Sequence, residues 1–474
     1  MIHTNRNESR ELIINTMLFG MSAVVSKLIV FLLLPLYTIY LTTAEYGTGE
    51  LVVNLMNFLM PFVSLHILSA LLRYGMDEKQ DKREVLFYAS ITILLGVVIV
   101  SIILQFVHLD SAVEQWKGYL VTLLVAYMMS NILSVFSKSL DKTKICAIGG
   151  IIYAISLLLG NLLLLMVLHR GIAGYIESMV FANLIMFFYY CKVLKIHQFF
   201  YIPHTINWSL WREMLVFSIP LIFNSISWWM SSFCDRFIIE YYMGESAVGI
   251  YSVAGKIPVL LTTISGVFMQ AWTLSAIKIY DSGGNASFIS DIYNKFWVLM
   301  VVSAGIFLCI VKPLVALFAH GDFVESWIYT PLLIYAAVIS SLGTFYASLY
   351  TSAKRNTMVM ITTAFGAIVN VGLNLVFIPM WGIQGAVVAT FISYILVLVY
   401  RMIDSRRFIP FPISYFRLGF SIVILWAESL FLILGHSSGW GLLFLSFLLI
   451  VNIGEILKIY YLIIRFGKRC CRIC

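Results

Sequence analysis

Charged residues are scarce in this sequence. Asp, Glu, Lys and Arg make up 11% of its 474 residues, whereas a soluble domain carries roughly a quarter. Hydrophobic residues make up 61%, and apolar runs close to the roughly 20 residues that cross a bilayer recur from one end to the other. Segments of about ten residues with alternating polarity, which build transmembrane barrels, are missing. The composition excludes a soluble domain and predicts an all-α polytopic membrane protein.

Signals for catalysis are also missing. The seven cysteines have no zinc or redox spacing, and no glycine-rich loop of the ATP-binding type is present. The loops predicted outside the membrane are too short to form a catalytic surface. We therefore expect a protein that is not an enzyme and needs no cofactor or metal. The net charge of +8 lies in short loops between apolar runs, which indicates topology and not a nucleic-acid partner.

Apolar runs predict about fourteen transmembrane helices. They cover residues 12–41, 50–73, 86–107, 118–137, 147–168, 172–191, 214–242, 249–274, 293–314, 328–350, 357–379, 383–403, 415–435 and 441–464. With a cytoplasmic N-terminus, the external loops hold only Lys117, Arg170 and Lys312 of the 31 Lys and Arg. Three more lie within spans and the rest are cytoplasmic, as the positive-inside rule requires. We expect a multi-pass protein with both termini in the cytoplasm.

Two short motifs repeat at nearly one period. The turn YLTTAEYG, Tyr40 to Gly47, resembles YMGESAVG, Tyr242 to Gly249, and HRGIAG around Gly171 resembles MWGIQG around Gly382. Parallel repeats are a transporter architecture with the substrate site between the halves. We expect two six-helix bundles and two extra helices, in four segments: an N-terminal bundle over 1–191, a cytoplasmic linker over 192–213, a C-terminal bundle over 214–403, and two further helices with a basic tail over 404–474.

The seventh span carries two adjacent charges in the stretch SISWWMSSFCDRFIIEYY, Ser225 to Tyr242. Asp235 and Arg236 lie roughly 12 Å inside the external turn at 1.5 Å per residue. A short Asp side chain cannot snorkel to the interface, so it must face protein or water. Helical spacing predicts two polar stripes. One holds Asn224, Trp228, Ser231 and Asp235, and the adjoining one holds Ser225, Trp229, Ser232, Arg236 and Glu240.

Two further cations lie on polar helix faces within the membrane. Lys27 is near the middle of the first span, and Lys256 lies in the eighth at about the depth of Arg236. Three cations on three polar faces predict one water-filled cavity with positive walls. In the alternative, Arg236 pairs with Asp235 or Glu240, and the lysines only cap carbonyl groups.

The remaining candidates have weaker support. Arg73, at the cytoplasmic end of the second span, could meet an anionic substrate or could be an ordinary interface anchor. Two further asparagines join Asn224 and Ser231 as candidate cavity-lining residues, namely Asn370 and Asn374. Each could instead form hydrogen bonds between helices.

Asp235 has two interpretations. It is either a static counter-ion for Arg236 or an ion-coupling residue that binds a proton or Na⁺ and releases Arg236 in another state. Adjacent positions on a helix point about 100° apart, so the two side chains need not pair directly. Ser231, one turn away, could help to hold an ion. We favour the ion-coupling interpretation.

Several of these segments resemble the Wzx-type polysaccharide flippases of the superfamily that includes multidrug extruders and lipid II flippases. The resemblance is carried by Asn15-Thr16 with Gly20 and Lys27, EYG (Glu45 to Gly47), LLRYG (Leu71 to Gly75), DRFII (Asp235 to Ile239), VGIYSVAGKI (Val248 to Ile257) and NVGLNLVFIPMWGIQGAVVAT (Asn370 to Thr390). It covers nearly the whole chain. The order and spacing of these motifs carry the resemblance.

The resemblance implies a flippase in the bacterial inner membrane. Its substrate would be an oligosaccharide on undecaprenyl pyrophosphate, moved to the periplasmic leaflet for O-antigen, capsule or exopolysaccharide synthesis. It also implies alternating access through a cationic central cavity, contact with membrane lipid, and a polysaccharide polymerase and chain-length regulator as partners. Fixed Lys and Arg charges can replace the water that a diphosphate loses.

Three other classes are weighed against a flippase. A drug or cation antiporter of the same superfamily would favour acidic cavity walls and usually has twelve spans. A sugar transporter of the major facilitator type would carry a Gly-rich basic signature, which RYGMDEKQDKRE (Arg73 to Glu84) is not. A membrane polysaccharide polymerase or ligase would need a large external loop. The sugar composition of the substrate and the coupling ion are not encoded in any motif.

Overall fold

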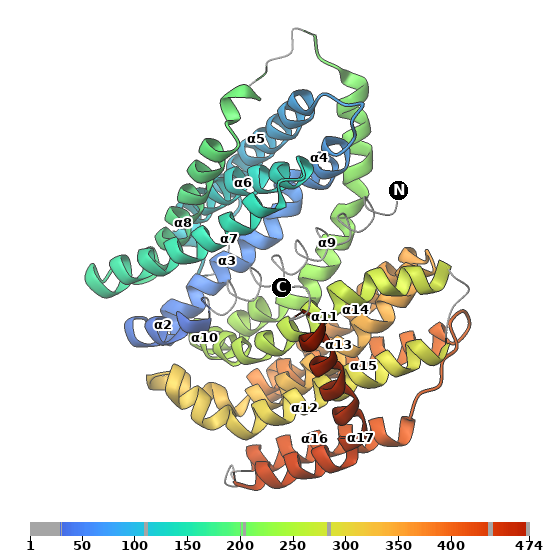
Figure 1. Cartoon of the computed structure of the whole chain (residues 1–474). Coiled ribbons are helices and arrows are strands. Elements are labelled where there is room, and N and C mark those ends of the chain that lie inside the picture. The colour runs from blue at the N-terminus through green and yellow to red at the C-terminus, as the bar shows by residue number, and fades with distance from the viewer. Residues whose placement is uncertain are drawn as a thin grey trace. The chain divides into compact units, whose positions relative to one another are not determined.

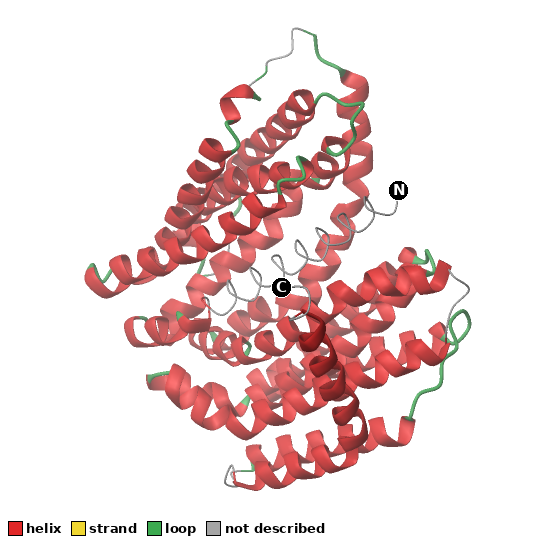
Figure 2. Cartoon of the chain, viewed as in Figure 1, coloured by secondary structure: helices red, strands yellow, loops and turns green. Residues whose placement is uncertain are grey.

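The computed structural model describes residues 29, 31–108, 112–199, 201, 205–281, 286–434 and 439–470. Figure 2 shows that these residues form helices joined by loops, with no strand among them. Twelve helical segments among the described residues are long and apolar enough to cross a membrane, and the count is thirteen if the bent pair α3–α4 is one span. The predicted all-α membrane fold is confirmed. The first predicted span, 12–41, lies largely outside the described residues.

Contacts divide the chain into two compact units, residues 1–249 and 250–474. The first unit contains α2 (Leu34–Tyr40), α3 (Thr43–Ser64), α4 (Ile67–Gly75), α5 (Lys82–Phe106), α6 (Lys117–Ser139), α7 (Thr143–Asn161), α8 (Gly171–Val193) and α9 (Trp208–Met243). Helix α7 continues as a π-helix over Leu162–Val167. In Figure 1 the helices α3 and α5 to α8 lie side by side, in blue to green.

Helix α10 (Glu245–Ala254) connects the two units in sequence. The second unit contains α11 (Lys256–Asp281), α12 (Ala286–Phe318), α13 (Thr330–Ser352), α14 (Asn356–Trp381), α15 (Ile383–Ser405), α16 (Tyr415–Ile433) and α17 (Gly439–Cys470). Its core is α13, which is flanked by α11, α12 and α15 and carries fully buried aromatic side chains such as Phe345 and Tyr346. Helix α9 groups with the first unit, because it packs on α3 and α4. The bundle and linker boundaries expected from the sequence stay a prediction.

The turns of the second repeated motif each contain a glycine with positive φ. Gly171 and Gly382 both adopt a left-handed φ, +56° and +60°, which favours glycine. Three residues later in each motif, a glycine lies against the backbone of the preceding helix. A Cβ on Gly174 would lie 3.1 Å from the Leu164 carbonyl oxygen, and one on Gly385 would lie 2.1 Å from the Phe377 carbonyl oxygen. The two turns therefore share a glycine with positive φ and a glycine packed on the preceding helix.

The first repeated motif forms a reciprocal contact. Thr42 caps α3, because its hydroxyl accepts from the Glu45 amide at 3.2 Å and the Glu45 carboxylate accepts from the Thr42 amide at 2.8 Å. A Cβ on Gly47 would lie 2.0 Å from the Glu245 carbonyl oxygen, and one on Gly249 would lie 2.1 Å from the Thr43 carbonyl oxygen. Each glycine thus meets the residue four positions before the other glycine, which is the pairing of a local two-fold axis.

Gly47→Ala is expected to lower the midpoint of thermal unfolding of the purified protein. The added methyl group has no room against the backbone of α10, and such overpacking costs about 1–3 kcal/mol. The matched control is Gly118→Ala in α6, where a Cβ would meet nothing within 4 Å. Equal midpoints for the two variants would contradict the close crossing.

Candidate functional site

Helix α9 carries the two charges that the sequence places inside the membrane. The Asn207 side chain caps its start by accepting from the Leu210 amide at 3.2 Å, and Gly244 with a φ of +81° ends it. Its 36 residues make a helix of about 54 Å, longer than the hydrocarbon core of a bilayer. The polar stripes predicted from the sequence therefore lie on one continuous helix.

The stripe that contains Arg236 faces α3 and α4 within the first unit. Ser225 lies 2.7 Å from His66 Nε2, and the Trp229 indole donates to the Asn54 carbonyl oxygen at 2.9 Å. The Trp229 ring also packs on Phe58, with ring centroids 4.6 Å apart. These contacts fix the rotation of α9 about its axis, so Ser232 and Arg236 follow on the same side.

Asp235 and Arg236 form an ion pair. Arg236 Nη1 lies 3.3 Å from Asp235 Oδ1, and the same oxygen accepts from the Arg236 amide at 2.9 Å. Their side chains are 7% and 14% exposed. Arg236 Nη1 also donates to the Ser232 carbonyl oxygen at 3.0 Å, and the guanidinium lies 5.3 Å from the centre of the Phe233 ring. This is the pairing that the sequence left open as the alternative to a cation facing a cavity, and it forms because a long Arg side chain can fold back along the helix.

The other residues of the Asp235 stripe are more exposed. Asn224 and Trp228 are exposed and Ser231 is half-buried, whereas Asp235 is 5% exposed. Arg73 is exposed in the last turn of α4.

Lys256 is half-buried at the first position of α11, directly after the break at Gly255. It belongs to the second unit and Arg236 to the first. Lys27 lies outside the described residues. The shared cationic cavity stays a prediction.

The two asparagines of α14 bond to each other and to the next helix. Asn370 Nδ2 donates to Thr390 of α15 at 3.3 Å, and Asn374 Nδ2 donates to Asn370 Oδ1 at 3.0 Å. Both are buried. This is the interhelical arrangement that the sequence left open as the alternative to cavity lining.

A buried acid that sequence reasoning missed lies in α3. Glu50 is 8% exposed, and its Oε1 accepts hydrogen bonds from the hydroxyls of Tyr46 at 2.9 Å and Tyr175 at 3.1 Å. Tyr37 stacks on Tyr46 and meets Tyr175 edge to face. The available signal was the spacing of Tyr46 and Glu50, which puts both on one helix face. Glu50 was overlooked because it begins the predicted second span.

A buried cation was missed in the second unit. Arg401 of α15 is 6% exposed and donates to Thr362 at 2.9 Å, to Thr363 at 3.0 Å and to the Gly343 carbonyl oxygen at 3.0 Å. The sequence assigns Arg401 to a cytoplasmic loop. The internal repeat is the sequence signal for this position. Tyr190 lies as many residues after Gly171 as Arg401 lies after Gly382, so the two residues occupy equivalent places on their helices. The Tyr190 hydroxyl likewise reaches across, to the Cys146 carbonyl oxygen at 3.3 Å.

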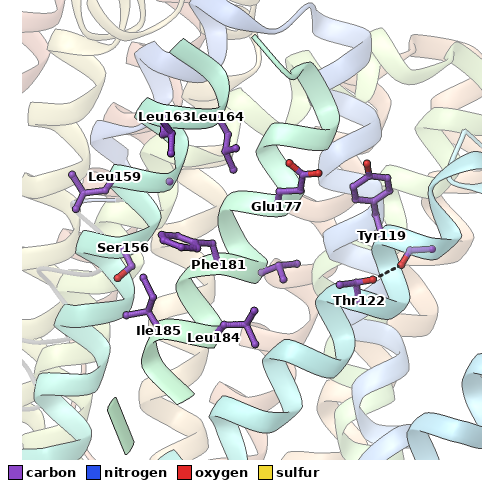
Figure 3. Close-up of a pocket in the computed structure, with 13 residues that line it drawn as sticks. Tyr119, Thr122, Ser156, Leu159, Leu163, Leu164, Glu177, Phe181, Leu184 and Ile185 are labelled. Atoms are coloured by element: carbon purple, nitrogen blue, oxygen red, sulfur yellow. Dashed lines mark hydrogen bonds between the residues drawn. The ribbon is translucent and has the colours of Figure 1, made fainter. Parts of the chain in front are cut away.

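A cavity of about 850 Å³ lies between α6, α7 and α8. Figure 3 shows Glu177 among side chains that are mostly apolar, including Leu164, Phe181 and Leu184. Glu177 pairs with Arg170 at 2.9 Å. No residue that the sequence nominates for the site lines this cavity.

Comparisons with known proteins agree on the fold. A family model described as polysaccharide biosynthesis protein matches residues 12–277. The lipid II flippase MurJ in an inward closed conformation matches with a TM-score of 0.69 and 15% identity, over 94% of this chain and 100% of that chain. An inward-facing multidrug resistance transporter of the MATE family gives 0.61 and 14%, over 81% and 98%.

A transporter of the MOP superfamily from Pyrococcus furiosus gives a TM-score of 0.60 and 14% identity, over 83% of this chain and 94% of that chain. Its binding pocket is described as having reverse polarity. No curated protein matches the sequence. At such identities the structural matches show a shared fold.

Proposed function

Because the chain belongs to the family of polysaccharide biosynthesis proteins, we propose that it is a Wzx-type flippase. It moves an oligosaccharide linked to undecaprenyl pyrophosphate from the cytoplasmic to the periplasmic leaflet of the bacterial inner membrane. The product feeds synthesis of O-antigen, capsule or exopolysaccharide, and a polymerase and a chain-length regulator act next. Both termini lie in the cytoplasm.

The observation that carries the proposal is the guanidinium of Arg236 on the polar stripe of α9. A buried cation in a membrane helix marks a substrate path by default. Arg presents two donors in a plane, which matches the oxygens of a diphosphate. In the structure this guanidinium forms an ion pair with the Asp235 carboxylate, so a diphosphate would have to compete with that carboxylate. Lys27, Lys256 and Arg73 are the other cations proposed to meet the substrate.

Glu50 is the observation that favours a second candidate, a multidrug or cation antiporter. A buried carboxylate surrounded by Tyr37, Tyr46 and Tyr175 is a combination suited to a cationic ligand. The MATE transporters share the fold. The two candidates differ in the sign of the substrate charge, so one experiment separates them.

Removing the gene from its host is expected to abolish surface polysaccharide. Lipid-linked oligosaccharide should accumulate in the cytoplasmic leaflet, because its polar head cannot cross the hydrocarbon core unaided. The measurement compares the accessibility of that oligosaccharide to a glycosidase in inverted and in right-side-out membrane vesicles. Cation sensitivity of the cells, measured in parallel, is the control. Unchanged polysaccharide together with hypersensitivity to cationic drugs would instead support the antiporter.

A further inference from the structure

We propose that the His66 imidazole is a proton-binding site that controls the bend between α3 and α4. The proposal rests on contacts inside the first unit and goes beyond the flippase assignment, since it needs no particular substrate. Leu65 and His66 separate the two helices, which meet at 56°. Predicted from the sequence as one span, 50–73, this segment is broken in the structure.

The break is held in an unfavourable backbone conformation. Leu65 has φ and ψ of 44° and 30°, and His66 has 55° and 19°. Left-handed backbone is unfavourable for residues other than glycine, because the Cβ atom comes too close to the following carbonyl oxygen. Within the described ranges, no other two consecutive non-glycine residues have positive φ. A conformation of this kind persists only where its surroundings enforce it.

Hydrogen bonds from three serines enforce the break. The Ser64 hydroxyl accepts from the His66 amide at 3.2 Å. Ser69 of α4 lies 3.0 Å from His66 Nδ1, and Ser225 of α9 lies 2.7 Å from His66 Nε2. A second contact, between Tyr74 and Phe217, lies eight positions further along α4 and eight positions earlier on α9. The two helices are therefore antiparallel and joined at both ends of α4.

The ionisable groups of the surrounding helices lie away from His66. Helices α5, α6 and α9 pack on α4. The charged residues of these five helices are Glu45 and Glu50 on α3, Arg73 on α4, Lys82, Arg83 and Glu84 on α5, Lys117 and Lys138 on α6, and Arg212, Glu213, Asp235, Arg236 and Glu240 on α9. Their tyrosines and cysteine are Tyr46, Tyr74, Tyr88, Tyr119, Tyr127, Tyr241, Tyr242 and Cys234.

Contacts between the helices show how far along each helix these groups lie from His66. Gly96 of α5 meets the Val63 carbonyl, so Glu84 lies about 18 Å along α5 from the level of the break. On α9, Glu213 and Asp235 lie about 18 and 15 Å from Ser225 by the same rise per residue. Arg73 is about 10 Å away along α4. Within the described part of the first unit, His66 therefore has neutral hydroxyls as partners and no adjacent carboxylate, which suits the uncharged ring.

Protonation changes the hydrogen bonding at this site. The neutral ring donates through one nitrogen and accepts through the other, so one serine accepts from it and the other donates to it. A proton added to the free lone pair makes both nitrogens donors, and the donating serine must turn its hydroxyl hydrogen away. Among the described residues of the first unit, the partners of the ring are uncharged serines, and charge is costly inside the membrane. The ring then leaves Ser225 for water, and the left-handed residues relax so that α4 moves relative to α9.

The experiment measures the distance between spin labels at Met76 and Trp208 in the full-length protein, with its seven cysteines replaced. Both positions are exposed, one after α4 and one at the start of α9. Across pH 5 to 8, where His changes charge, the unsubstituted protein should shift from one distance to a second as the pH falls. His66→Gln should keep the first distance at every pH, because Gln can bond but cannot charge. Ser225→Ala should show the second distance even at high pH.

His169→Gln is the matched control. His169 is also a non-glycine residue with positive φ, but it lies in the turn before α8, so this variant should titrate like the parent. A pH-dependent distance that survives in His66→Gln would overturn the proposal, and so would a parent protein whose distance does not change with pH. Neither result would bear on the flippase assignment, since no substrate is present.

Discussion

Arg236→Ala should abolish surface polysaccharide in cells that depend on this protein. If the guanidinium binds the diphosphate, its removal leaves a charged head without the groups that replace its lost water. Arg236→Lys should restore export only in part, because an ammonium cannot present two parallel donors. Lys256→Ala is expected to cause the same loss as Arg236→Ala. The measurement is surface polysaccharide per unit of membrane-embedded protein.

Two controls separate binding from folding. Arg170→Ala removes another paired cation, but one that faces Glu177 beside the apolar cavity, and it should export normally. The double variant Asp235→Asn/Arg236→Met removes both members of the ion pair, so it should fold and still fail to export. Normal export by Arg236→Ala and Lys256→Ala would make both residues structural and remove the basis of the proposed cationic cavity.

Composition was enough to predict the helical membrane fold, because the need to satisfy backbone polar groups in lipid leaves few alternatives. The repeat was also readable, since its glycines serve backbone conformations that other residues resist. Gly171 and Gly382 need a left-handed φ, and Gly47 and Gly249 need the space of a missing side chain. Both requirements apply to a single residue, so each is visible in the sequence as a glycine.

The break at Leu65 and His66 has no comparable signal in the sequence. Neither residue is glycine or proline, and Pro61 lies within α3. The His66 ring contacts Ser69 and Ser225, and Ser225 is 159 positions away in the chain. Apolar content continues across the break, so hydropathy shows one span.

Long side chains explain two further contacts. Arg401 lies at the cytoplasmic end of the predicted span 383–403, and its guanidinium reaches between helices to Thr362 and Gly343. Arg236 reaches Asp235 although the two positions point to different sides of α9. Helical periodicity places Cβ atoms, and it does not say where a side chain with several rotatable bonds ends. Candidate residues were therefore easier to name than their partners.

Asp235→Asn is expected to destabilise the protein by about 3–5 kcal/mol, because it removes one charge of a buried ion pair. The carboxylate is 7% exposed and lies 3.3 Å from Arg236 Nη1, so solvent can replace little of what is lost. The measurement is the midpoint of denaturation of the purified protein. Arg236→Met in the same chain should regain most of the loss, since no charge is then stranded, and this double-mutant cycle isolates the pair.

The cycle also decides between the two roles of Asp235. A static counter-ion requires the loss in the single variant and the recovery in the double variant. The ion-coupling role predicted from the sequence requires something else, namely a single variant as stable as the parent whose transport no longer responds to an imposed proton or sodium gradient. The closed pair in the structure fits the first role, and it also fits one state of the second. Stability measured beside gradient response therefore separates them, because only a residue that changes partners during transport can lose its coupling without loss of the fold.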